Sequence, residues 1–270
     1  MIEKYYSVTN KITYLQSPLF LKNNISHCFT TRIGGVSEGP FKSLNLACGA
    51  GELRDSKENV YKNHELVANI FGLTAADICK TVQEHTADIL YADETFRGVG
   101  LTKPQFNFAV DGLVTDKSGV LLSVRAADCV PILFCDKRAG VVAALHSGWR
   151  GTAQNAPVNA LNIMCEHGSS IKDIVVAIGP SIKGCCYDVG IELFERFMAL
   201  DSDYAAAFAR RNGKWYLNLT QIIEKMLVNT GVSPEKISIC PDCTKCNNNL
   251  YFSHRLSGAN RGTMGAFICV

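Results

Sequence analysis

Apolar residues recur along the chain in short runs, and turn-forming residues separate one run from the next. Four stretches have the apolar spacing of a helix: residues 62–73, 156–168, 190–201 and 218–232. Gly72, Gly168 and Gly231 stand near the ends of three of them, where glycine commonly caps a helix. The pattern therefore predicts several amphipathic helices, each with one face toward a core.

The strand pattern is clearest in residues 108–149, where two polar turns separate three apolar runs. Residues 171–182 predict a short buried strand that Gly-Pro ends, and residues 236–240 and 265–270 predict two more strands. Strands and helices are interspersed over the whole length without a boundary. Residues 1–270 are therefore predicted to form a single α/β domain with a mixed β-sheet.

Composition narrows the class of protein. Of 270 residues, 47% are hydrophobic and 19% are charged, which allows a sizeable core. The net charge of +2 argues against a nucleic-acid partner, which usually demands a basic face. No apolar run approaches the roughly 18 residues of a membrane span, and the start MIEKYYSVTN lacks the pattern of a signal peptide. We therefore expect a cytoplasmic protein without a membrane partner.

Twelve cysteines are present, and three of them have a regular spacing. Cys240, Cys243 and Cys246 form a C-x2-C-x2-C pattern, which resembles part of an iron–sulfur motif. The continuation Asn-Asn-Asn-Leu supplies no fourth ligand, so a cluster or a second zinc is not expected from this run. The adjacent pair Cys185 and Cys186 is interpreted as two thiols.

Three metal-binding residue types fall near the ends of apolar runs. His85 follows a short apolar stretch, Cys129 lies between two runs, and His146 ends the run VVAAL. If residues 120–124, 130–134 and 141–145 are neighbouring strands, Cys129 and His146 lie at adjacent strand ends. Two imidazoles and one thiolate suit Zn²⁺, and three protein ligands leave a position open for catalysis. The alternatives are a Cys129–His146 nucleophile pair and ordinary core residues.

Five further polar residues are candidates for substrate chemistry. Arg32 and Arg150 stand beside glycine turns and could hold an anion through their guanidinium groups. Asn45 is a candidate for a hydrogen bond to substrate. Asp111 and Asp128 are candidate catalytic carboxylates that move protons, although Asp128 could equally serve the structure.

Taken together, the motifs resemble those of the laccase-domain or polyphenol oxidase family, whose members are also described as purine nucleoside phosphorylases. The matching stretches follow the family order from about residue 28 to about residue 255. They are TTRIGGVSEGPFKSLNLA, QEH, DGLVTD, RAADCVPILF, HSGWRGT, IGPSIKGCCYDVG, KWYLNL and DCT. A single such motif is only suggestive, whereas eight in order are specific.

The resemblance implies a zinc ion held by His85, Cys129 and His146, the same three residues that their chemistry suggests. It also implies an α/β/α sandwich and the phosphorolysis of adenosine, inosine, guanosine and methylthioadenosine, with adenosine deamination as a second activity. The expected partners are thus purine nucleosides and phosphate, and the chain either acts alone or forms a homodimer.

The word laccase suggests a copper oxidase, but the composition argues against one. A multicopper oxidase needs about ten histidines, many of them in H-x-H pairs. This chain has six histidines and no H-x-H pair. Binding of Cu²⁺ at the zinc site is still expected to compete, because copper binds most nitrogen sites more tightly than zinc does.

The chain departs from the family's usual pattern at four positions: Ala126, Ser147, His254 and Thr263. None of them is a proposed zinc ligand, so they bear on the shape of the pocket and on substrate preference. A zinc-dependent purine nucleoside enzyme is the first interpretation. A cysteine hydrolase that uses Cys129 with His146 is the second, and a partner-binding module is the third.

Overall fold

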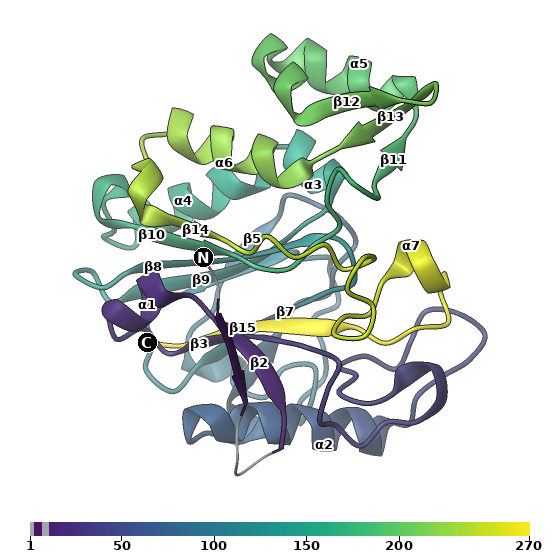
Figure 1. The fold of residues 1–270 in the computed structure, drawn as a ribbon. Coiled ribbons are helices and arrows are strands. Elements are labelled where there is room, and N and C mark those ends of the chain that lie inside the picture. Colours follow the sequence, from purple (N-terminus) through teal and green to yellow (C-terminus); the bar gives the residue numbers. More distant parts are fainter. Residues whose placement is uncertain (1–2, 7–10) are drawn as a thin grey trace.

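The computed structural model describes residues 3–6 and 11–270 and contains two six-stranded sheets and one small sheet (Figure 1). The first sheet has the spatial order β1 (Glu3–Tyr6), β2 (Thr13–Gln16), β3 (His27–Thr30), β15 (Met264–Ile268), β7 (Leu121–Ala126) and β4 (Ile78–Lys80). The second has the order β14 (Ile237–Ile239), β10 (Val175–Ile178), β8 (Val130–Asp136), β9 (Val141–Ser147), β6 (Gly112–Thr115) and β5 (Ile89–Tyr91). The small sheet has the order β11 (Asp188–Val189), β13 (Lys214–Leu217) and β12 (Phe208–Arg211).

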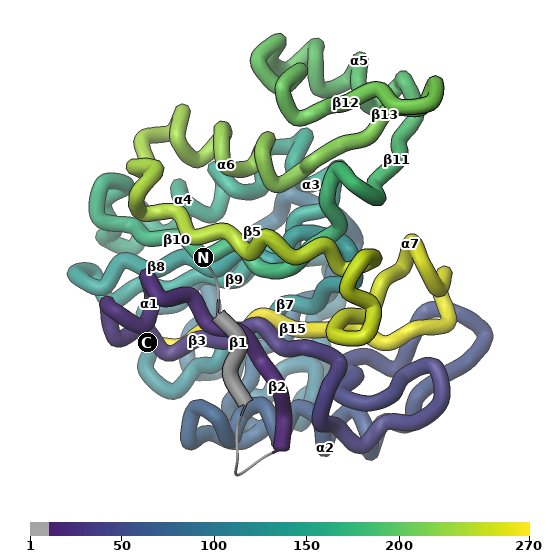
Figure 2. Tube along the Cα trace, in the orientation of Figure 1, coloured from purple at the N-terminus to yellow at the C-terminus, as the bar shows by residue number. Residues whose placement is uncertain are grey.

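Both large sheets are mixed, which confirms the predicted α/β class. The strands divide over two sheets that pack face to face, whereas one sheet was predicted. Leu122 and Val124 of β7 and Leu133 of β8 are fully buried in the core between the sheets. The layers therefore run helix, sheet, sheet, helix, as Figure 2 also shows.

The crossing from one sheet to the other occurs between β7 and β8. Asp128 has a backbone φ of 96° there, in the left-handed region that breaks an extended run. The prediction that residues 120–124 and 130–134 are neighbouring strands is therefore wrong. The expected pairing of 130–134 with 141–145 is confirmed, since β8 and β9 pair antiparallel along their whole length.

The bounds of the helices are α1 (Pro18–Lys22), α2 (Lys57–Ala68), α3 (Trp149–Ala153), α4 (Ala156–Glu166), α5 (Ile191–Leu200), α6 (Leu219–Asn229) and α7 (His254–Ser257). Helix α2 covers the outer face of the first sheet and α4 and α6 cover that of the second, whereas α1 and α7 lie at the sides (Figure 1). Helix α2 packs through Val67 and Ala68 on the first sheet, and α4 and α6 pack through Leu161 and Ile223 on the second. Helices α4, α5 and α6 match the predicted ranges closely.

Helix α2 begins five residues before the predicted range. Its first turn is polar and therefore shows no apolar periodicity. Ser56 caps this turn, because its hydroxyl accepts a hydrogen bond from the Asn59 N–H at 3.0 Å. At the other end a short 3₁₀ turn leads to Gly72, whose φ of 69° is the left-handed conformation expected of a glycine cap.

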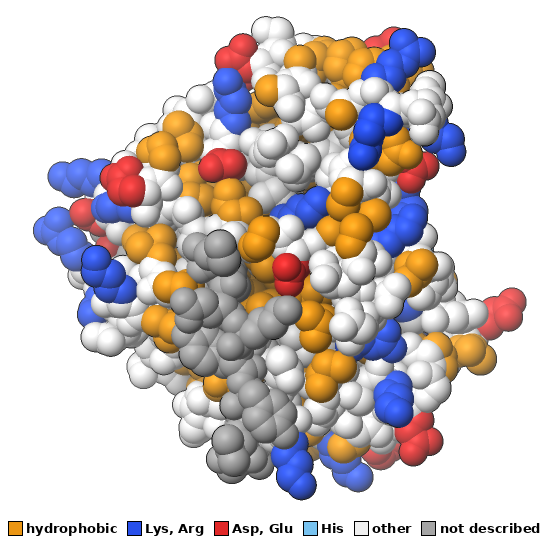
Figure 3. Space-filling model, viewed as in Figure 1, with side chains coloured by type: hydrophobic (Ala, Val, Ile, Leu, Met, Phe, Trp, Pro, Cys, Tyr) orange, Lys and Arg blue, Asp and Glu red, His pale blue; other side chains and the backbone are white. Residues whose placement is uncertain are grey.

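Within the described ranges, no helix combines the length and the apolar character that crossing a membrane requires. The face in Figure 3 carries lysine, arginine, aspartate and glutamate side chains interspersed rather than gathered by sign. A net charge of +2 accords with this distribution.

Candidate metal centre and its cavity

The structure brings His85, Cys129 and His146 together. Their ligand atoms all lie within 4.8 Å of one another, and Cys129 Sγ is 3.8 Å from His85 Nε2. The β8–β9 register, with Pro131 opposite His146, places Cys129 next to the histidine at the paired ends of these strands. His85 reaches the same point from the loop after β4. Residues that are 44 and 17 positions apart in the sequence thus converge through sheet pairing.

Asp111 holds both histidines in place. Its carboxylate lies 2.7 Å from His146 Nδ1 and accepts hydrogen bonds from the backbone N–H groups of Glu84, His85 and Thr86. These bonds support the left-handed backbone of His85, whose φ is 64°. The bond to Nδ1 leaves Nε2 of His146 for the centre, an arrangement typical of metal-bound histidine.

This environment corrects the prediction that Asp111 moves protons. The carboxylate is fully buried, is surrounded by hydrogen-bond donors and does not line the cavity described below. The hydrogen bonds from His146 and the backbone outweigh burial, so the pKa of Asp111 is lowered. Asp111 is therefore a positioning residue.

The two groups at the centre strongly perturb each other. Burial raises the pKa of the Cys129 thiol, but the neighbouring His146 and His85 outweigh it and bring the value to about 6. Burial lowers the pKa of His146, but Cys129 and Asp111 raise it to about 9. A thiolate beside a protonated imidazole is thus favoured, and a metal cation bound by Cys129 and His146 would take the place of the imidazole proton.

The glycine after Ser147 is required by close packing. A Cβ atom on Gly148 would lie 2.8 Å from His85 Cδ2 and 3.1 Å from Cys129 Sγ. At Gly151 a Cβ atom would lie 2.8 Å from the backbone oxygen of Thr86. The motif HSGWRG therefore combines one candidate ligand with two glycines that let the His85 loop approach it.

Substituting Gly148 tests this packing. Gly148→Ala is expected to displace His85 and to weaken zinc binding by about 10- to 100-fold, the range typical of changes around a metal ligand. Zinc affinity measured by competition with a chromogenic chelator gives the result, with far-UV circular dichroism as the control for folding. Unchanged zinc affinity in a folded variant would show that zinc binding by His85 does not depend on its close packing against Gly148.

The three candidate ligands open onto a cavity of about 620 Å³. Basic and polar side chains form much of its wall: Lys57, Lys80, Gln83, Lys103, Gln105, Arg125, Arg261 and Thr263. Val60, Tyr61 and Leu101 contribute apolar surface. The cavity is therefore large enough for a small-molecule ligand and is positively charged on one side.

Three of the cations in this wall lack a carboxylate partner. No ion pair among the described residues includes Lys80, Arg125 or Arg261. The Nε atoms of Arg125 and Arg261 and the hydroxyl of Thr263 are buried without a hydrogen-bond partner. Burial and nearby Arg125 lower the pKa of Lys80 to about 7. Buried cations without partners are costly, so the wall is suited to a bound anion.

The predicted anion-binding arginines do not line this cavity. The Arg32 guanidinium donates to the backbone oxygens of Lys42 and Asn248 and lies over the Phe252 ring. Arg150 is exposed on α3 and lies 4.3 Å from the centre of the Trp149 ring. The cavity lining therefore gives no support to the prediction that Arg32 and Arg150 bind an anion at this site.

Asn45 and Asp128 also support the structure rather than the cavity. Asn45 is fully buried, and its carboxamide bonds Ala47, Asp55 and the backbone N–H of Thr263. Asp128 is buried and accepts hydrogen bonds from Thr244 Oγ1, Ser253 Oγ and the Arg255 N–H. Neither side chain lines the cavity, so neither the substrate contact nor the proton transfer predicted for them is supported.

The basic wall was missed by the sequence analysis. Lys80 with Gln83, Arg125, and Arg261 come from three separated segments and form no single motif. The one available signal was Arg125, a charged residue inside the apolar strand 121–126. Two of the noted departures from the family pattern, Ala126 and Thr263, do line the cavity.

The fold and the centre define a class of protein. Residues 26–270 match the family described as "Multi-copper polyphenol oxidoreductase laccase", and the chain belongs to that family. The resemblance found from the motifs is thereby confirmed.

Several similar proteins are named for reactions on purine nucleosides rather than for phenol oxidation. Purine nucleoside phosphorylase YlmD from Geobacillus stearothermophilus is 36% identical over 249 residues, which are 88% of each chain. The crystal structure of YlmD from that organism has a TM-score of 0.85 and 31% identity over 99% of both chains. Adenosine deaminase RL5, from an unknown prokaryotic organism, is 31% identical over 87% of this chain and 90% of its own. Mouse purine nucleoside phosphorylase LACC1 is 31% identical, and the match spans 58% of its length.

The histidines of this chain cannot form the multicopper centre that the family description names. Apart from His85 and His146, the four remaining histidines lie elsewhere: His27 bonds Ile25, His64 is buried on the inner face of α2, His167 stacks on Tyr91, and His254 begins α7. Too few imidazoles converge for several coppers, whereas two imidazoles and a thiolate suit one zinc.

Proposed function

We propose that this chain is a zinc-dependent purine nucleoside phosphorylase that acts on adenosine, inosine, guanosine and methylthioadenosine, with adenosine deamination as a second activity. The observation that carries the proposal is the shared cavity, which is lined both by His85, Cys129 and His146 and by a wall of unpaired cations. The names of the relatives, phosphorylases and one deaminase, support both reactions.

His85, Cys129 and His146 would hold the zinc, with Asp111 orienting His146. The ion would supply Lewis-acid chemistry, and three protein ligands leave room for one more. Copper is expected to compete for the same donors in vitro.

Lys80, Arg125 and Arg261 bind the phosphate. Guanidinium groups suit its oxygens, and the two buried Nε atoms have no other partner. Phosphate oxygen forms a bond to the sugar C1′ as the bond from C1′ to the purine breaks, and the electron pair leaves with the base. The wall holds the nucleophile beside this bond, which favours attack by phosphate over attack by water.

The proposal is tested by chromatography of purified protein incubated with adenosine or inosine, with and without phosphate. Phosphate-dependent release of free base, absent in Cys129→Ala, is the expected result. Inosine formed from adenosine without phosphate would report the second activity. Neither free base nor inosine under any condition would overturn the proposal.

A cysteine hydrolase is the second candidate. Asp111, His146 and Cys129 are connected as in a nucleophile triad, and the thiol pKa of about 6 favours its thiolate. Such an enzyme would lose activity to iodoacetamide and keep it in the presence of a chelator. The zinc enzyme is inactivated by removal of the metal.

The basic wall also predicts a pH dependence of phosphate binding. Lys80 loses its charge as the pH rises through about 7, because burial and Arg125 lower its pKa despite the opposing effect of Cys48. Phosphate affinity is therefore expected to fall by about an order of magnitude between pH 6.5 and pH 8.5. Phosphate itself becomes more negative over this range, which acts in the opposite direction.

Isothermal titration with inorganic phosphate at several pH values measures this dependence. Lys80→Arg keeps its charge and is expected to flatten the profile, whereas Lys103→Arg, at the exposed mouth of the cavity, is the matched control. A profile that is unchanged in Lys80→Arg would assign the titration to another group.

A further inference from the structure

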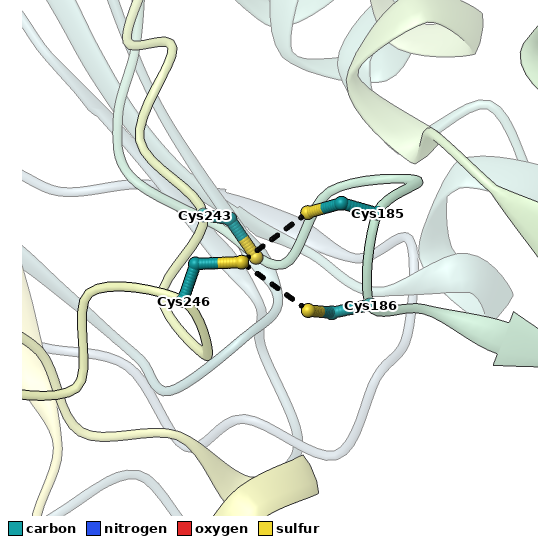
Figure 4. Close-up of side chains that lie close together, drawn as sticks. All are labelled: Cys185, Cys186, Cys243 and Cys246. Carbon is teal, nitrogen blue, oxygen red and sulfur yellow. Dashed lines mark hydrogen bonds between the residues drawn. The ribbon is translucent and has the colours of Figure 1, made fainter.

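Four cysteines from two loops converge away from the cavity (Figure 4). Cys185 and Cys186 follow β10, and Cys243 and Cys246 follow β14. Their four sulfur atoms all lie within 4.8 Å of one another. Cys246 Sγ is 3.5 Å from Cys185 Sγ and 3.4 Å from Cys186 Sγ.

Sheet pairing explains why the two loops meet. Strands β10 and β14 are parallel neighbours, so the chain leaves both at the same edge of the sheet. A bridge between Ser181 and Cys243 and a hydrogen bond from the Thr244 N–H to the Ser181 oxygen continue the contact beyond the strands. Cys185 and Cys186 are free thiols, as the sequence analysis expected, and the structure places them beside the thiols of Cys243 and Cys246.

We propose that Cys185, Cys186, Cys243 and Cys246 bind one Zn²⁺ ion as a tetrahedral four-thiolate site. Zn–S bonds of about 2.3 Å place the sulfurs of a tetrahedron about 3.8 Å apart. The sulfur separations here lie around that value. A disulfide needs about 2.05 Å, and all four cysteines are free thiols.

The separation of the four sulfur atoms also indicates which kind of metal centre they can form. In a four-iron cluster each thiolate binds a different iron, which requires sulfurs more widely separated than these. A single ion bound by four thiolates fits. Four protein ligands leave no open position, so the ion has a structural role.

The position of the site indicates which part of the chain the ion would stabilise. Thr244, next to Cys243, donates to the Asp128 carboxylate, and the Ile182 N–H donates to the Asp128 backbone oxygen at 2.9 Å. Asp128 precedes Cys129, the thiol at the cavity. The zinc thus fixes the two loops that hold the backbone beside Cys129.

None of the four cysteines lines the cavity, so this site is separate from the proposed catalytic centre. Cys240, the first residue of the C-x2-C-x2-C pattern, is buried in the core between the sheets and is not among the four. Only two residues of that pattern, Cys243 and Cys246, belong to the group, and the other loop supplies the remaining two.

Metal analysis of the full chain, purified under reducing conditions without chelators and loaded with Zn²⁺, tests the site. About two zinc ions per chain are expected in the wild type. Cys246→Ser is expected to lose one equivalent and to lower the Tm by several degrees, because a structural metal contributes directly to folding. Cys165→Ser, on α4 outside both cysteine-containing groups, is the matched control and keeps both ions.

His85→Ala separates this test from the proposed function. It removes the cavity ion only, so one equivalent remains if the four-thiolate site exists, even where Cys246→Ser fails to fold. Substitution of that remaining ion by Co²⁺ gives the intense thiolate-to-cobalt absorption of a four-sulfur site. No zinc in His85→Ala, iron in place of zinc, or a disulfide among these cysteines in the reduced protein would overturn the proposal.

Discussion

Replacing His85 by alanine is expected to lower phosphorolysis by about 10³-fold or more. The metal's contribution to charge stabilisation is worth several kcal/mol, and loss of one of three ligands removes it. The His85→Ala variant also distinguishes the zinc-dependent phosphorylase from the cysteine hydrolase. A cysteine hydrolase would need only Cys129, His146 and Asp111, which are already connected without it. Initial rates of base release, together with the zinc content, give the measurement.

His254→Ala is the matched control, because this histidine is exposed at the start of α7 and does not line the cavity. It is expected to keep wild-type turnover. Full activity in His85→Ala would contradict the metal-dependent mechanism and favour the nucleophilic cysteine.

Replacing Arg125 by methionine is expected to raise the KM for phosphate by about 10- to 100-fold. The change removes charge-assisted hydrogen bonds from a buried guanidinium whose Nε has no other partner. The KM for the nucleoside and the rate of adenosine deamination, which uses no phosphate, are expected to stay close to wild type. Initial rates over a matrix of phosphate and inosine concentrations separate the two constants.

Lys103→Met is the control for a general loss of positive charge, since Lys103 is exposed and donates to the Thr95 backbone oxygen. It is expected to change the phosphate KM by less than about twofold. Equal losses of phosphorolysis and deamination in Arg125→Met would place the anion elsewhere and give Arg125 a role in the structure or in nucleoside binding.

The two proposed zinc ions have different relations to the fold. The cavity ion has three ligands, two from paired strand ends and one from a loop that Asp111 holds. The four-thiolate ion joins loops that follow β10 and β14. Both sites lie at the ends of neighbouring strands. Asp128 and Thr244 connect the surroundings of the two.

Local pattern predicted much of the secondary structure. Helices α4, α5 and α6 each bury one apolar face, and the corresponding periodicity is visible within each of these three segments of the sequence. The start of α2 was missed because a polar first turn held by Ser56 has no such periodicity. The division of the strands into two sheets was missed as well, since apolar runs are equally consistent with one sheet.

The sequence by itself determined the three candidate metal ligands at the cavity, the helices with a clear apolar face, and the family, because each is a property of short segments. The tertiary structure decided which groups each of these side chains contacts. Arg32 and Asn45 were assigned to substrate on local grounds, yet their hydrogen bonds go to distant backbone groups. Lys80, Arg125 and Arg261 come to line one cavity, and the four cysteine sulfurs come within 4.8 Å of one another, only when separated segments pack together. The physical reason is that hydrogen-bond satisfaction and charge burial depend on neighbours in space, and sequence spacing does not specify those neighbours.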